Sequence, residues 1–120
     1  MSVRRAADVP RDPVSAGSGT ERQVLIGPDT GPNFALRRFI MQPGGGMPRH
    51  TNAVEHEQYV LRGNATIGIG DETFTVRADD VDFIPAGVPH WYRAEGEEPF
   101  EFLCVVPNAP DRIEIVEPEC

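Results

Sequence analysis

Positive charge is scarce in this chain, and long apolar runs are absent. There is no lysine, and 11 arginines stand against 19 acidic residues, which gives a formal net charge of −8. Such a chain lacks the basic field that draws a protein to nucleic acids or anionic membranes, so we expect neither as a partner. The longest apolar run covers only residues 102–106, which predicts no signal peptide and no membrane span.

Cysteine is scarce as well. Cys104 and Cys120 are the only two, and their separation fits neither a disulfide framework nor a close zinc-binding pair. We therefore expect a cytoplasmic protein. The 120 residues suffice for a single domain with one core, and they predict no second domain.

The chain contains 12 glycines and 12 prolines, which separate short apolar segments. Turn residues recur about every eight to twelve positions between segments rich in Val, Ile, Phe, Thr and Tyr, which is typical of an all-β sandwich or barrel. Residues 43–46 read as a break between strands, and residues 66–69 and 73–76 flank a turn as a hairpin. The predicted strands are residues 24–26, 34–41, 55–62, 65–69, 73–76, 81–84, 90–94 and 100–106, with a short one at 112–116.

The ends of the chain differ from its middle. Residues 1–20 are polar and proline-containing, which predicts an extended N-terminal arm that could add an edge strand to a partner. Residues 21–108 form the predicted folded domain, and residues 109–120 a C-terminal tail.

The chain contains only three histidines, His50, His56 and His90. If residues 52–55 form the bend of a hairpin, His50 and His56 return side by side, and the turn at residues 85–89 presents His90 from a third strand. Three neutral imidazoles around one ion form a site for a first-row divalent metal, with positions left open for water or substrate. Without that convergence they are three unrelated histidines, and their positions alone leave both interpretations open.

The spacing around these histidines resembles the two motifs of the cupin superfamily. The first motif runs Gly, five residues, His, one residue, His, three or four residues, a further ligand, six residues, Gly. The positions that match it are Gly44, His50, Asn52, His56 and Gly63. The second motif, Pro-x-Gly-x-x-His, is matched by Pro85, Gly87 and His90. The likeness covers about residues 21–108. Within the superfamily, the sequence resembles most the small single-domain cupins with four histidines.

This resemblance implies an all-β cupin jelly-roll β-barrel, or double-stranded β-helix, in a homodimer that exchanges N-terminal strands. It also implies one divalent metal per chain, iron or manganese ahead of zinc, nickel or copper, held by His50, His56 and His90. Asn52 stands where a fourth histidine is expected, so it is a labile ligand, a hydrogen-bond donor to a bound water, or a bystander. Asp79 replaces the glycine that usually opens the second motif.

Gln58 and Tyr92 are the candidate catalytic residues, because strand alternation places each beside a histidine. Gln58 either touches bound water or substrate, or pairs with neighbouring backbone. Phe102, Cys104 and Val60 are expected to line the substrate pocket. The apolar neighbours of Cys104 argue against a nucleophile.

Four arginines are candidates for a substrate carboxylate, which one of them could bind as a bidentate fork. They are Arg37, Arg38, Arg49 and Arg93. The alternative is that each pairs with a surface acid.

Three-histidine cupins often resemble one another in being iron-dependent dioxygenases, so the expected function is oxidative cleavage of a small enolisable or aromatic substrate. Two alternatives remain. One is a redox-neutral isomerase, cyclase or lyase whose metal acts as a Lewis acid. The other is a non-catalytic cupin that binds a small molecule.

Overall fold

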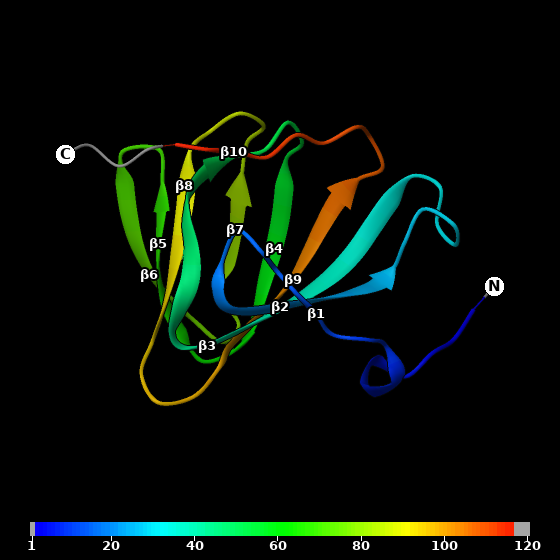
Figure 1. The fold of residues 1–120 in the computed structure, drawn as a ribbon, viewed down its shortest axis with the longest axis horizontal. Helices are drawn as coiled ribbons and strands as arrows, with labels where there is room; N and C mark the ends of the chain where they lie inside the picture. The colour runs from blue at the N-terminus through cyan, green and yellow to red at the C-terminus, as the bar shows by residue number, and fades with distance from the viewer. Residues whose placement is uncertain (1, 117–120) are drawn as a thin grey trace.

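The computed structural model describes residues 2–116 and is built almost wholly of β-strands (Figure 1). Cys120 and the rest of the predicted tail beyond residue 116 lie outside the described residues. One 3-10 helix, η1 (Ala6–Asp8), precedes ten strands. They are β1 (Asp12–Pro13), β2 (Ser18–Ile26), β3 (Phe34–Thr51), β4 (His56–Arg62), β5 (Asn64–Ile69), β6 (Glu72–Arg77), β7 (Val81–Ile84), β8 (His90–Glu95), β9 (Phe100–Pro107) and β10 (Glu114–Ile115).

The strands form one curled sheet in the order β6-β5-β8-β3-β9-β4-β7. β2 pairs with β3 at the side of this path, and β1 and β10 pair with β2 and β3. The sheet encloses an apolar core that includes Met41, Ile67, Ile84, Phe100 and Phe102, all at most 2% exposed. None of the helices among the described residues is long and apolar enough to cross a membrane.

The expected break at residues 43–46 is wrong, because β3 runs through it without ending. Gly44 supplies the bend, with a φ of 81° that a side chain would oppose. Gly46 then passes so close to β8 that an added Cβ would overlap the carbonyl oxygen of Tyr92. Both glycines therefore keep one strand continuous around a corner of the barrel, where the sequence suggested a turn.

The two expected hairpins have different outcomes. β5 and β6 pair in antiparallel register from Asn64–Arg77 to Ile69–Glu72, which confirms the hairpin around residues 70–72. β3 and β4 do not pair with each other within residues 2–116, so residues 52–55 are not the bend of a hairpin. The reason is that both hydrogen-bonding edges of β3 are taken, one by β2 and β10 and the other by β9 and β8, while β4 pairs with β9 and β7.

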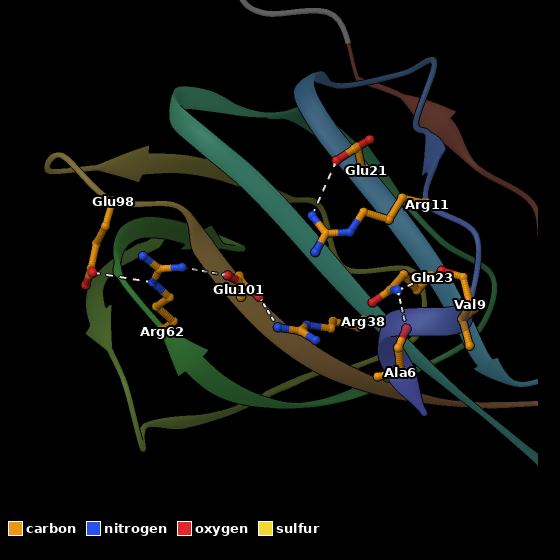
Figure 2. A network of polar contacts seen from close by, with 9 residues as sticks. All are labelled: Ala6, Val9, Arg11, Glu21, Gln23, Arg38, Arg62, Glu98 and Glu101. Atoms are coloured by element: carbon orange, nitrogen blue, oxygen red, sulfur yellow. Dashed lines mark hydrogen bonds and ion pairs between the residues drawn. The ribbon is translucent and has the colours of Figure 1, made fainter. Parts of the chain in front are cut away.

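The N-terminal arm lies against its own chain. Gln23 on β2 donates from Nε2 to the carbonyl oxygens of Ala6, at 2.8 Å, and Val9, at 2.9 Å (Figure 2). Val9 is buried, and β1 adds a short edge to β2. Strand β2 begins at Ser18, so the regular structure starts within the stretch expected to be arm.

Candidate metal centre

The structure brings the three histidines together at one end of the barrel, from three strands. His50 lies near the end of β3, and His56 and His90 are the first residues of β4 and β8. His50 pairs with His90 across β3 and β8, and their ring centroids are 4.1 Å apart. The His56 and His90 ring centroids are 5.6 Å apart. None of the three residues is more than 5% exposed.

Hydrogen bonds fix the tautomer of two of these rings. Nδ1 of His50 lies 2.7 Å from the Pro48 carbonyl oxygen, and Nδ1 of His90 lies 2.9 Å from that of Val88. Because a carbonyl oxygen only accepts, each Nδ1 carries the proton and each Nε2 keeps its lone pair when the ring is neutral. Both bonds reach back two residues, so the local backbone before each histidine orients its ring.

His56 contributes an atom with no partner. Its Nδ1 lies 3.3 Å from Sγ of Cys104 and 3.4 Å from Nη2 of Arg37. Its Nε2 is buried and has no hydrogen-bond partner among the described residues. A buried polar atom without a partner is costly, so this nitrogen calls for a ligand.

The surroundings keep all three rings neutral. Burial lowers the pKa of His56 to about 3, assisted by the positive charge of Arg37. Burial also lowers the pKa of His90 to about 4, and it lowers the pKa of His50. The neutral imidazole is the form that binds metal, so the donor set is prepared for one at neutral pH.

The donor chemistry therefore fits a first-row divalent metal, although the rings are not fully arranged around one. Within residues 2–116, no three His, Cys, Asp or Glu side chains are already placed to hold an ion. The His50 ring leans on His90 at 4.1 Å, closer than the spacing of about 4.5 to 5 Å expected of two rings whose nitrogens each lie about 2.1 Å from one ion. His50, His56 and His90 are the residues that would hold such an ion.

Asn52, the expected fourth position, reaches the same cavity but has a protein partner. Its Nδ2 donates to Oδ2 of Asp111 at 3.1 Å, and the backbone N–H of Ala53 donates to Oδ1 at 2.9 Å. Asn52 thus ties the segment before β10 to the rim of the site. The second N–H of the same amide group can still donate to a bound water.

A chain of three polar side chains runs behind the histidines. The Tyr92 hydroxyl donates to Oε1 of Gln58 at 2.8 Å, and Nε2 of Gln58 donates to Oδ1 of Asp82 at 2.8 Å. This orientation of the amide gives each of its atoms a complementary partner. Burial raises the pKa of Asp82 to about 6 and raises that of Tyr92 well above its ordinary value.

The cavity in front of the histidines has a volume of about 50 Å³. Phe102 and Cys104 line it, as do Gln58 and Tyr92. Val60 does not line the cavity, because it is fully buried within the core. Strand alternation predicted the inward direction of its side chain but not its distance from the cavity. Burial raises the pKa of the Cys104 thiol, which keeps it protonated and unreactive.

Several residues of the site were missed from the sequence. Asp82 carried no sequence signal, because the apolar Val81 and Phe83 beside it predict that it faces outward, whereas both of these face solvent and Asp82 faces inward with Ile84. Arg22 and Asp111 carried none either, since Arg22 lines the cavity and Asp111 contacts Asn52 from segments distant in the sequence.

With this geometry established, the comparison with known proteins decides the family. The profile described as the Cupin domain matches residues 37–106, more than half of the chain. The chain belongs to the cupin family. This match confirms the resemblance seen in the histidine motifs, and the curled all-β sheet of this cupin confirms the jelly-roll fold. The φ of 74° at Asp79 explains why other cupins have glycine at that position.

Solved and curated relatives extend the comparison. The polyketide cyclase RemF from Streptomyces resistomycificus is 30% identical, with a TM-score of 0.86 over 98% of this cupin and 87% of that chain. A cupin-2 domain from Rhodospirillum rubrum is 25% identical, with a TM-score of 0.82 over 98% and 80% of the two chains. The xanthan biosynthesis protein XanB from Xanthomonas campestris pv. campestris (strain B100) is 30% identical over 62% of this cupin. This cupin spans only 16% of the length of XanB.

Proposed function

We propose that this cupin is a metal-dependent enzyme that promotes a redox-neutral reaction, a cyclisation or isomerisation, of a small enolisable carbonyl compound. The observation that carries the proposal is the position of the unpartnered Nε2 of His56 on the same cavity as the hydrogen-bonded Tyr92 and Gln58. Metal ligands and a pair of proton-holding groups on one cavity suit a reaction that polarises a carbonyl and moves a proton.

His50, His56 and His90 would hold the metal, and Asn52 stands beside them at the rim. A divalent ion bound there supplies Lewis acidity, which makes the carbon next to a carbonyl group more acidic. The other contacts described below are made by the chain's own side chains.

Tyr92 and Gln58 orient the enol. The proton that leaves the carbon passes to water, because the protonated Tyr92 hydroxyl and the Gln58 amide are not bases. The Tyr92 Oη–H donates a hydrogen bond to the substrate oxygen in place of Gln58, and Gln58 Oε1 accepts a hydrogen bond from the enol hydroxyl. Asp82 keeps the Gln58 amide in this orientation by accepting from Nε2. Phe102, stacked on the Tyr92 ring with centroids 5.3 Å apart, holds that ring in place.

The resemblance to RemF favours this reaction class over oxidative cleavage. RemF is named a polyketide cyclase, and it matches this cupin over nearly the whole chain. The three-histidine site alone is compatible with a dioxygenase, but no side chain around the cavity points specifically to oxygen chemistry. The dioxygenase reaction expected from the sequence is therefore the second choice.

Proton exchange provides a direct test. Metal-loaded wild type is incubated with acetoacetamide in D2O under strict anaerobiosis, and loss of the C2 proton signal is followed by NMR. We expect faster exchange than in buffer, unchanged by admitting oxygen. The Tyr92→Phe variant keeps the ring stacking and should retain its metal while the exchange rate falls about tenfold or more.

Two results would overturn the proposal. Exchange no faster with metal-loaded wild type than with His56→Ala would remove the enolisation step. Oxygen uptake in proportion to loss of the probe would restore the dioxygenase.

A further inference from the structure

Two arginines line the cavity without an acidic partner. Arg22 on β2 and Arg37 on β3 both border it, and within residues 2–116 neither forms an ion pair. The Nε atom of each is buried and makes no hydrogen bond in the described part of the chain. Both residues are half-buried, and a partly buried guanidinium with no counter-charge is a strong site for a negatively charged ligand group.

Strand register explains why both arginines face inward. Arg22 pairs with Phe39, and Val24 pairs with Arg37, across β2 and β3. Paired residues point to one face and residues two apart share it, so the two arginines flank the Phe39 ring on the inner face. The Arg37 guanidinium carbon lies 5.1 Å from the centroid of that ring, so a cation–π interaction holds the guanidinium over the ring.

Two of the other candidate arginines, Arg38 and Arg93, show what a paired guanidinium looks like in this fold, whereas Arg49 is exposed and makes no ion pair within residues 2–116. Arg38, the next residue along β3, faces outward and donates to Glu101, which Arg62 also contacts (Figure 2). Arg93 pairs with Glu95 at 3.2 Å. Arg37 instead directs Nη2 toward Cys104 Sγ, at 3.5 Å, beside the His56 ring.

We propose that Arg37, assisted by Arg22, binds a carboxylate group of the substrate inside the cavity next to the histidines. This inference rests on the proposed function, because it names the class of substrate for that same site: an enolisable carbonyl compound that carries a carboxylate. A planar guanidinium matches a carboxylate with two parallel hydrogen bonds. The cavity, at about 50 Å³, admits a group of that size.

The test compares two probes of nearly equal shape, acetoacetate and acetoacetamide, which differ in charge. Dissociation constants are measured by ligand-observed NMR with metal-loaded wild type, Arg37→Gln and Arg93→Gln. Arg93→Gln removes the same charge from outside the cavity and is the matched control. We expect wild type and Arg93→Gln to bind acetoacetate about tenfold or more tightly than acetoacetamide, and Arg37→Gln to bind both equally.

Arg37→Lys and Arg22→Gln provide the same test if Arg37→Gln does not fold. Lysine retains the charge without the fork, so Arg37→Lys should keep only part of the preference, and Arg22→Gln should reduce it. Equal binding of both probes by wild type, or an undiminished preference in Arg37→Gln or in Arg22→Gln, would overturn the proposal.

The outcome is separable from that of the proposed function. Preference for acetoacetate without proton exchange on acetoacetamide would leave the carboxylate site standing and reject the enzyme reaction. Proton exchange on acetoacetamide without a preference for acetoacetate would support the enzyme reaction and reject the carboxylate site.

Discussion

Acid should destabilise the metal-free protein because its cavity holds histidines that cannot take up protons while folded. The pKa of His56 is lowered to about 3 and that of His90 to about 4, both chiefly by burial. An unfolded imidazole has a pKa near 6.5. Between these values the unfolded chain binds more protons than the folded one, so the free energy of unfolding falls as the pH falls below about 6.5.

The size of the effect follows from the same shifts. At pH 5, each of the two histidines lowers the free energy of unfolding by about 2 kcal/mol relative to pH 8. Asp82 acts in the opposite direction, because its pKa is raised to about 6 by burial and its unfavourable charge is removed on acidification. Its protonation returns about 1 kcal/mol, which leaves a net loss of about 3 kcal/mol.

Urea unfolding of chelator-treated protein at pH 8 and pH 5 measures this loss. The midpoint should fall by about 1 to 2 M urea, given the slopes usual for small domains. His56→Gln is the matched variant, because it removes one low-pKa imidazole and should recover about 2 kcal/mol of the difference. Equal midpoints at the two pH values in wild type would refute the conclusion that these rings are buried and neutral.

Three further substitutions probe the scaffold of the site. Gly46→Ala should lower the free energy of unfolding by about 3 kcal/mol or more, because its Cβ would force β3 from β8. Gly44→Ala meets no atom and should lose only about 1 kcal/mol to its positive φ. Urea unfolding of both variants measures this difference, and equal losses would contradict it. Asp82→Asn should gain about 3 kcal/mol at pH 8 and about half of that at pH 5, because the penalised form of a carboxyl with a raised pKa is the charged one and the penalty disappears only below the unfolded pKa. The same denaturation at both pH values checks this, and a gain that did not depend on pH would exclude the cause. Gln23→Ala removes two hydrogen bonds to residues 6 and 9, so it should lower the free energy of unfolding by about 1 to 2 kcal/mol. It should also speed tryptic cleavage of the N-terminal arm. Unchanged cleavage would mean that other contacts hold the arm.

Strand positions could be predicted from this sequence, and strand pairing largely could not. Alternation and turn residues located the segments that became β4 to β9, because both signals are local. The continuity of β3 through Gly44 and Gly46 depends on hydrogen bonds to β2 and β8, strands that are distant in the sequence. A glycine that bends a strand and one that ends it look the same in a sequence.

The candidate site divides in the same way. The histidines could be singled out because their spacing matches a family motif, and Gln58 and Tyr92 followed from alternation. The partners of these residues could not, because Asp82 on β7 and Arg37 on β3 are brought to them by strand pairing, which the sequence does not show. Whether an arginine is paired is decided by which acids the fold brings near, so Arg37 and Arg38 are distinguished only in three dimensions.

The metal content of the purified protein tests the central claim most directly. Wild type, His56→Ala and Arg93→Gln, purified without tag or chelator, are compared by elemental mass spectrometry. The account predicts close to one divalent transition metal per chain in wild type and Arg93→Gln, and its loss from His56→Ala, because His56 Nε2 has no other partner in residues 2–116. No metal in wild type, even after reloading with iron, manganese, zinc and nickel, would contradict it.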